Sequence, residues 1–270
     1  MIVLVAGAGG RVGELVVALL LARGHEVRGL VRGAQQAEDL EELGAMPVIA
    51  DLRGDVEWVT DRCDAVIFAA GARHAADLAA IDAGGAAKLA EAAARSDVRR
   101  FVLCSAVGAD RPEQRDEPIR TFLSAKHQAE RRLHELELPW TVLRFGRLTD
   151  ASGTGRIGTA LPGAEPVTLS RDDAALTAVE ALDRANLVHR TIDVIDGDRH
   201  VAEVLDAVEP EPLPPSRPSG LAAGQPDNPT SARNRLATDA GPFDPLVDYE
   251  GEGELPPEIR GNDDPAPGIP

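Results

Sequence analysis

The sequence predicts an α/β fold in which helices cover both faces of a doubly wound parallel sheet. Short apolar runs rich in β-branched residues alternate with amphipathic, alanine-rich segments along residues 1–208. Near-continuous apolar strands are typical of strands that are buried on both faces, and the helices between them supply the right-handed crossovers that parallel strands need. Ligands of such sheets bind at the carboxyl ends of the strands.

The first half of the chain begins this alternation with strands and helices of ordinary length. Gly24 and Gly44 follow the first two helical patterns. Glycine suits the left-handed residue that ends many helices, so both glycines support the expected boundaries. In chain order we expect strand 2–6, helix 12–23, strand 26–31, helix 35–43, and strands 47–50 and 65–69.

The second half continues with longer helices. Ser170 stands before Arg171-Asp172-Asp173. A serine N-cap and two acids in the first turn both stabilise a helix N-terminus, so a helix is expected to begin here. In chain order we expect helix 77–95, strand 99–105, helix 117–136, strand 141–145, helix 171–183 and strand 191–195.

The composition changes sharply after Val208. Residues 209–270 hold 14 of the 20 prolines, 12 acidic residues and the single tyrosine, Tyr249. A polar, proline-rich and acidic segment cannot bury enough apolar surface to offset the entropy of folding. We therefore expect one folded domain over residues 1–208 and a mostly disordered tail over residues 209–270.

Charge and composition exclude several classes of function. A formal net charge of −17 argues against binding nucleic acid or anionic lipid through a basic surface. The longest apolar stretch, Leu15–Ala22, is too short to cross a bilayer, and the chain begins without a charged leader region. We expect a soluble, cytoplasmic protein. Its bias toward acids and arginine fits either a proteome adapted to high salt or a GC-rich genome.

The most informative motif joins the first expected strand to the first helix. It reads Gly7-Ala8-Gly9-Gly10-Arg11-Val12-Gly13. Glycines allow a tight turn and a close approach of the main chain to a pyrophosphate, and the helix N-terminus offers N–H groups and a positive dipole end to the anion. Gly13 allows close contact between helix and strand. This context predicts a dinucleotide site, with a purely structural turn as the alternative.

The end of the second expected strand indicates which nucleotide would bind. An NAD enzyme usually has Asp or Glu there for the ribose hydroxyls, but this chain reads Val31-Arg32-Gly33. Arg32 can form charge-assisted hydrogen bonds to a 2′-phosphate, and Arg11 could supply a second contact. Both could instead be ordinary surface arginines. We expect NADP(H) in preference to NAD(H).

Further short motifs follow the glycine loop in a specific order. They are Val31-Arg32, Ala50-Asp51-Leu52, Asp64-Ala65-Val66-Ile67, Ala69-Ala70-Gly71, Ser105–Asp110, Leu143–Thr149 and Ser170–Asp173. This order resembles the atypical short-chain dehydrogenase/reductase family, in particular its small NmrA-like, NAD(P)-binding oxidoreductases. The resemblance covers about residues 1–205 and implies a Rossmann-like fold that binds NAD(P).

The resemblance also implies which residues contact each part of the cofactor. All of them stand at the carboxyl ends of expected parallel strands, where the pattern of the sheet independently places a ligand. For the first of them, Asp51, a loop-capping role is the alternative. The resemblance implies Asp51 and Leu52 at the adenine. It implies Ala69, Ala70 and Gly71 at the ribose and pyrophosphate, and Phe145, Gly146 and Leu148 at the nicotinamide.

The proton-transfer residues of the family are incomplete in this chain. The resemblance implies a cooperating Ser, Tyr and Lys, with Tyr-x-x-x-Lys on one helix face. Ser105 and Lys126 stand at matching positions, but Phe122 replaces the tyrosine. Lys126 could hold the nicotinamide ribose or be a surface lysine, and Ser105 could orient a ligand or simply end a strand. The histidines lack the Cys and carboxylate neighbours of a metal site, so no metal is expected.

Two functions are compatible with these residues. The first is hydride transfer from NADPH to a small conjugated acceptor, a quinone, flavin or carbonyl compound, with solvent supplying the proton that tyrosine would otherwise deliver. The second is a non-catalytic module that binds NADP(H) and reports its redox state to a protein partner. The sequence does not identify the small-molecule substrate.

Overall fold

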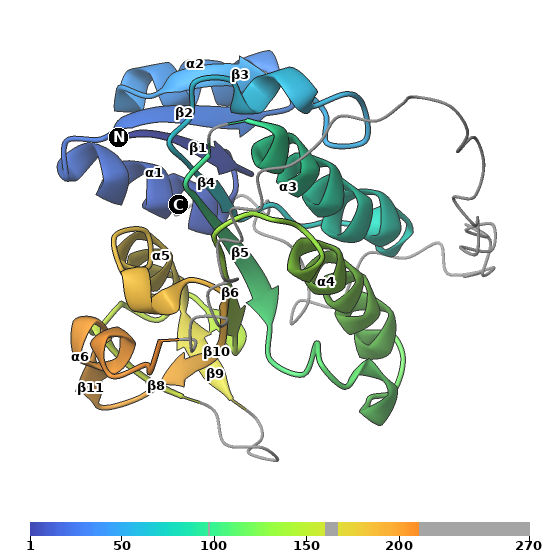
Figure 1. The fold of residues 1–270 in the computed structure, drawn as a ribbon, viewed down its shortest axis with the longest axis vertical. Coiled ribbons are helices and arrows are strands. Elements are labelled where there is room, and N and C mark those ends of the chain that lie inside the picture. The colour runs from blue at the N-terminus through green and yellow to red at the C-terminus, as the bar shows by residue number, and fades with distance from the viewer. Residues whose placement is uncertain (97, 160–166, 211–270) are drawn as a thin grey trace, which may run out of the picture. The chain divides into compact units, whose positions relative to one another are not determined.

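The computed structural model describes residues 1–96, 98–159 and 167–210, and its centre is a mixed β-sheet (Figure 1). Across the sheet, the described strands follow the order β11-β8-β10-β6-β5-β4-β1-β2-β3. Their bounds are β1 Ile2–Ala6, β2 Glu26–Val31, β3 Met46–Ile49, β4 Ala65–Phe68, β5 Arg100–Ala106, β6 Trp140–Phe145, β8 Arg156–Thr159, β10 Arg190–Asp196 and β11 Arg199–His200.

The strands from β3 to β10 run parallel, which confirms the predicted doubly wound sheet. β1 pairs with β2 on one side and with β4 on the other, so the strand order reverses direction at β1. Such a switch point leaves a crevice at the carboxyl ends of the central strands. This crevice positions the site described below.

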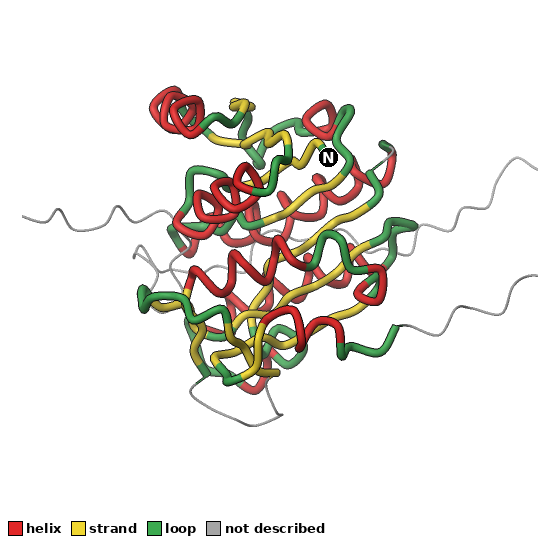
Figure 2. The backbone as a smooth tube through the Cα atoms, turned by 90° about the vertical axis from the view of Figure 1, so that its left-hand side faces the viewer, coloured by secondary structure: helices red, strands yellow, loops and turns green. Residues whose placement is uncertain are grey.

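Helices cover both faces of the sheet, as Figures 1 and 2 show. Alternate side chains of β1 enter two separate apolar clusters: Val3 and Val5 face one, and Leu4 and Ala6 face the other. The first cluster is covered by α1 (Arg11–Ala22), α2 (Ala34–Leu43), α5 (Arg171–Glu180) and α6 (Val201–Asp206). The second is covered by α3 (Ala86–Arg95) and α4 (Ile119–His134).

The predicted strands and most helices match the structure to within a few residues at each end. The expected helix 77–95 is the main difference, because a π-helix, η3 (Ala79–Gly85), precedes α3 in the same segment. Helix α5 begins as expected, with Ser170 Oγ accepting a hydrogen bond from the Asp173 N–H at 3.0 Å.

The structure also contains elements that the sequence did not predict. β8 and β11 form an antiparallel edge of the main sheet, and β7 (Arg147–Thr149) pairs with β9 (Thr168–Ser170) in a separate two-stranded sheet. These strands are two to four residues long, too short to show a period of hydrophobic alternation.

The predicted tail lies almost entirely outside the described residues, which end at position 210. The boundary after Val208 and the disorder of the tail therefore stay predictions. Within the described part of the chain, no helix combines the length and the apolar character that crossing a membrane requires.

Candidate functional site

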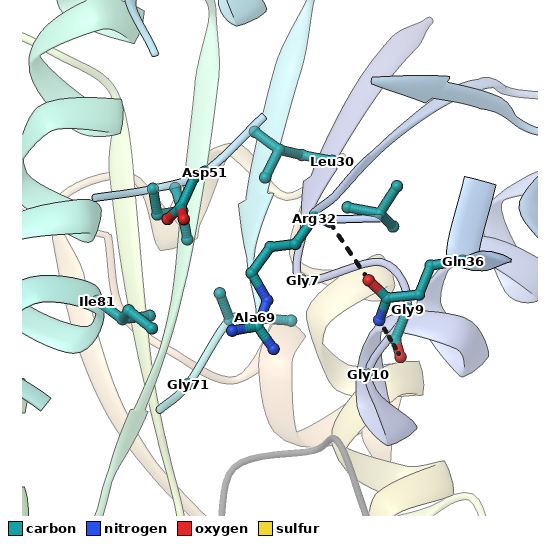
Figure 3. A pocket seen from close by; sticks show the side chains of 13 residues that line it. Gly7, Gly9, Gly10, Leu30, Arg32, Gln36, Asp51, Ala69, Gly71 and Ile81 are labelled. Atoms are coloured by element: carbon teal, nitrogen blue, oxygen red, sulfur yellow. Dashed lines mark hydrogen bonds between the residues drawn. The ribbon is translucent and has the colours of Figure 1, made fainter. Parts of the chain in front are cut away.

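A pocket open to solvent lies at the carboxyl ends of β1, β2, β3 and β4 (Figure 3). Its lining includes eight residues that the sequence predicted as cofactor contacts: Gly7, Gly10, Arg32, Asp51, Leu52, Ala69, Ala70 and Gly71. Gly9, Leu30, Val31, Gln36 and Ile81 complete it. The strands thus bring together segments that are far apart in the sequence.

The glycine loop has the geometry that close approach to a ligand requires. Gly7 has φ +81°, and a Cβ on it would lie 2.6 Å from Ala70 Cα. A Cβ on Gly13 would lie 1.9 Å from the Gly7 carbonyl oxygen, so any side chain there would collide with the loop. The Gly10 N–H donates to the Gly7 carbonyl at 3.0 Å, which closes the turn.

Helix α1 begins directly after this turn. Its N-cap is Gly10, and among the described residues no side chain caps it. The first N–H groups of a helix have no partner within the helix, and together with the helix dipole they attract an anion. Ala8 and Val12 are fully buried beneath the loop, in the cluster under α1, so their side chains support the loop from below.

Arg11 does not line the pocket, and its contact with a phosphate stays a prediction. Its guanidinium pairs with Asp150, and Arg171 Nη1 lies 2.6 Å from the same carboxylate oxygen. Burial and the neighbouring charge of Arg11 lower the pKa of Arg171 to about 10. Asp150 therefore holds two arginines together where α1 and α5 begin.

Arg32, by contrast, extends across the pocket toward Ala69 (Figure 3). Its backbone N–H donates to Gln36 Oε1 at 3.3 Å, and Gln36 Nε2 donates to the Gly9 carbonyl at 3.4 Å. The pocket therefore has a cation at the end of β2 and an amide, in place of an acid, between β2 and the glycine loop.

Asp51 caps a loop and also lines the pocket, while its contact with the adenine stays a prediction. It lines the pocket, and its Oδ1 accepts a hydrogen bond from the Arg53 N–H at 2.9 Å, which caps the loop after β3. The Arg53 guanidinium also pairs with it, with Nη2 2.8 Å from Oδ2. These hydrogen bonds from Arg53 lower the pKa of Asp51.

Lys126 lies on α4 but is not a surface lysine, so that alternative is wrong. Its side chain is 8% exposed, and Nζ lies 2.7 Å from Oδ1 of Asp82, which is itself 0% exposed. Asp82 belongs to π-helix η3, and its Oδ2 accepts a hydrogen bond from the Ala72 N–H at 2.8 Å. Lys126 does not line the pocket; Nζ lies 5.7 Å from the centre of the Phe122 ring.

Ser105 is buried at the end of β5 and does not line the pocket. Its hydroxyl donates to Glu130 Oε1 at 2.5 Å, and Glu130 Oε2 lies 2.6 Å from Arg144 Nη2. Because its proton is committed to a buried carboxylate, Ser105 in this arrangement can accept a hydrogen bond from a ligand but cannot donate one.

The residues expected at the nicotinamide lie at the end of β6 and directly after it, outside the pocket. Phe145 is buried in the cluster beneath α1 and α5, and Leu148 on β7 packs against the same cluster. Gly146 approaches the Val167 carbonyl so closely that a Cβ would lie 2.9 Å away. Their contact with a nicotinamide stays a prediction.

Three functional candidates were not predicted from the sequence: Gln36, Asp82 and Glu130. The signals were present but weak. Gln36 stands three residues after the helix N-cap, where Gln often turns back toward the preceding N–H. Glu130 follows Lys126 by four residues, on the same helix face. Asp82 had no local signal, because one partner, Ala72, precedes it by 10 residues and the other, Lys126, lies on a different helix.

The lining of the pocket suits the adenosine and pyrophosphate parts of a dinucleotide. It spans four strand ends, with bare main chain at Gly7, Gly9 and Gly10 and apolar side chains at Leu30, Leu52 and Ile81. A Cβ on Gly7 would overlap the neighbouring backbone, so the fold itself requires a residue without a side chain at this position. Bare amides suit a pyrophosphate and apolar side chains suit a flat base.

Comparison with known proteins agrees with this geometry. A family described as NAD(P)H-binding matches residues 7–185. The uncharacterized sugar epimerase YhfK of Bacillus subtilis is 36% identical over 210 residues, which cover 75% of this chain and 98% of that protein.

Solved structures show the same architecture. A Bacillus halodurans protein assigned to the NAD-dependent epimerases/dehydratases has a TM-score of 0.73 and 32% identity, over 76% of this chain and 99% of its own. A Streptococcus pneumoniae protein assigned as an NADH-flavin reductase has a TM-score of 0.62, with 73% of this chain and all of its own covered. At 21% identity, the second likeness shows the fold alone.

Proposed function

The chain belongs to the NAD(P)H-binding family of atypical short-chain dehydrogenases/reductases, and on that premise we propose that it is an NADPH-dependent oxidoreductase that works without a catalytic tyrosine. Its acceptor is a small conjugated compound, a quinone, flavin or carbonyl. The observation that carries the proposal is that the glycine loop and the Arg32 side chain line the same pocket.

Each part of the nucleotide has matching residues in the pocket. Amides of the glycine loop and of the start of α1 would hold the pyrophosphate. Leu30, Leu52 and Ile81 offer apolar contacts to the adenine. Arg32 would pair with the 2′-phosphate, which supports NADPH over NADH because no acid stands at the end of β2 to bind ribose hydroxyls.

The residues around Lys126 favour an acceptor that needs no tyrosine proton. When bound, NADPH supplies a hydride, and one proton from water completes the two-electron reduction of the acceptor. Phe122 cannot donate a proton, and the Ser105 hydroxyl is engaged by Glu130. The chain's contribution is then to hold the two reactants in the orientation that hydride transfer needs. The fold of the S. pneumoniae protein is consistent with a flavin as acceptor.

The same observations favour a second candidate, a redox sensor that binds NADP(H) without turnover. Lys126 and Ser105 are both engaged in buried contacts, with Asp82 and Glu130, so neither side chain is positioned as the family's proton-transfer group. Such a module would respond to the oxidation state of the nucleotide through a protein partner.

Turnover separates the two candidates. We expect the purified protein to bind NADPH more tightly than NADH and to oxidise NADPH in the presence of at least one quinone, flavin or carbonyl of a panel. Loss of NADPH absorbance and the reduced product are measured together. Tight binding that discriminates NADPH from NADP⁺, without turnover of any acceptor, would support the sensor instead.

We also propose that this activity is cytoplasmic. Cys63 and Cys104 are both free and buried, which fits a compartment where thiols stay reduced. Burial raises the pKa of the Cys104 thiol to about 12, so this thiol is protonated and unreactive at neutral pH.

A further inference from the structure

Gln36 connects the two parts of the pocket that would contact the adenosine end of the nucleotide. It is the third residue of α2, and its Oε1 accepts the Arg32 N–H while its Nε2 donates to the Gly9 carbonyl (Figure 3). The fit is close, since a Cβ on Gly9 would lie 2.6 Å from Gln36 Nε2. One side chain therefore fixes the spacing between Arg32 and the glycine loop.

The chemistry of an amide at this place differs from that of a carboxylate. An amide is neutral and has two N–H donors on its nitrogen, and the contact with the Gly9 carbonyl uses one of them. That contact is 3.4 Å long, at the weak end for a hydrogen bond. A carboxylate would be negatively charged and would only accept hydrogen bonds, which suits ribose hydroxyls and repels a phosphate.

We propose that Gln36 is a specificity-determining residue that selects the 2′-phosphate of NADPH together with Arg32. Its Nε2 donates to a phosphate oxygen, while its Oε1 keeps the Arg32 backbone in place so that the guanidinium reaches the phosphate from the other side. The inference rests on the proposed preference for NADPH and adds a second determinant to it.

If Gln36 only stabilised the start of α2, its variants would behave differently. A Gln or Glu at the third position of a helix stabilises the helix start by accepting an N–H from the residues before it, and Glu also interacts favourably with the helix dipole. Gln36→Glu therefore preserves helix capping while it places a negative charge in the pocket. If capping were the only role, this variant would fold well and bind both nucleotides as before.

The experiment measures Kd for NADPH and for NADH, and the melting temperature, in the wild type, Gln36→Glu, Gln36→Met and Arg32→Glu. Gln35→Glu is the matched control, because it adds the same charge one residue earlier on a side chain that instead contacts Asp39. We expect Gln36→Glu to weaken NADPH binding by about tenfold or more, as for loss of a hydrogen bond to a charged group, and NADH binding by a smaller factor, because a carboxylate cannot donate to the Gly9 carbonyl.

Gln36→Met should weaken NADPH binding by a smaller factor and leave NADH binding unchanged. Gln35→Glu should keep the wild-type ratio of the two dissociation constants. An equal loss for both nucleotides in Gln36→Glu, or an unchanged ratio, would overturn the inference. If Arg32→Glu abolishes a clear NADPH preference that Gln36→Glu leaves intact, the inference fails and the proposed function stands. If the wild type itself binds both nucleotides equally, the proposed preference fails first.

Discussion

Lys126 Nζ lies 2.7 Å from Asp82 Oδ1, and both side chains are buried. The pair joins α4 to π-helix η3. Through the hydrogen bond between Asp82 Oδ2 and the Ala72 N–H, it also holds the loop that follows β4. Ala69, Ala70 and Gly71 of that loop line the pocket. The family pattern assigns this lysine to the nicotinamide ribose. Here it instead pairs with a carboxylate that holds a loop of the nucleotide site in place.

We expect Lys126→Met to lower the free energy of unfolding by about 3–5 kcal/mol, because it leaves the Asp82 carboxylate buried without a counter-charge. Urea denaturation at constant m-value measures the loss. The double variant Lys126→Met/Asp82→Asn should recover part of it, since the amide oxygen of the introduced asparagine can still accept the hydrogen bond from the Ala72 N–H.

The chain's other lysine offers a matched control. Lys88 Nζ donates to the Gly54 carbonyl at 2.8 Å in an exposed contact, so Lys88→Met should cost about 1 kcal/mol or less. Equal losses for Lys126→Met and Lys88→Met would mean that the buried pair contributes little to the fold.

Restoring the missing hydroxyl with Phe122→Tyr tests the mechanism. A neighbouring cation lowers the pKa of a tyrosine, but here Asp82 offsets the charge of Lys126. We therefore expect Phe122→Tyr to reduce simple ketones poorly at neutral pH, with a rate that rises toward alkaline pH. Phe122→Tyr/Asp82→Asn should shift that rise to lower pH. Full activity of the single variant at neutral pH would show that Lys126 acts on position 122 despite its partner.

The sequence predicted the parallel core because local patterns determine it. The apolar runs at Ile2–Ala6 and Ala65–Phe68 coincide with β1 and β4, since strands buried on both faces leave a continuous apolar signal. The antiparallel edge gave no such signal. β8 and β11 are exposed on much of their surface and short, and their pairing depends on contacts between residues that are distant in sequence.

The site was predictable where the main chain forms it and less so where side chains meet across the fold. The glycine loop follows from Gly7, Gly10 and Gly13, because only glycine satisfies a tight turn against a helix. The direction of a long side chain is not set by its own sequence neighbours: Arg11 turns to Asp150, outside the pocket, whereas Arg32 crosses the pocket.

The close approach at Gly13 leads to a further prediction. Because a Cβ there would lie 1.9 Å from the Gly7 carbonyl oxygen, Gly13→Ala must displace α1 or the loop. We expect a loss of several kcal/mol in stability, at least about 2, together with loss of NADPH binding. Gly33→Ala is the control, since a Cβ on Gly33 meets nothing within 4 Å. Thermal unfolding and nucleotide titration measure both effects, and wild-type binding by Gly13→Ala would contradict the tight-turn argument.

A crowded set of carboxylates around Arg144 gives a pH-dependent prediction. Arg144 pairs with Glu130 at 2.6 Å, and its Nη1 lies 3.6 Å from Asp110 Oδ1 and 3.8 Å from Asp193 Oδ1. One guanidinium thus faces three carboxylates. Burial raises the pKa of Asp193, and the charges of Asp110 and Glu130 add to this effect against the opposing effect of Arg144.

A carboxyl group whose pKa is higher in the folded than in the unfolded state binds protons more readily when folded. Its contribution therefore stabilises the fold at low pH and is lost as pH rises through the folded-state pKa. At neutral pH Asp193 is ionised, so the folded state bears the full free-energy cost of burying this charge. We expect Asp193→Asn to raise the free energy of unfolding at pH 7 by up to about 1 kcal/mol, the usual scale for a partly exposed ion-pair site.

That advantage should shrink as pH falls toward about 4, where the unfolded-state carboxyl also takes up its proton. Urea denaturation of the wild type and of Asp193→Asn across this range measures it. Asp198→Asn removes the same charge from an exposed residue just after β10 and should change stability little at any pH. A loss of stability at neutral pH in Asp193→Asn would instead show that the 3.8 Å contact with Arg144 outweighs the cost of burying the carboxylate.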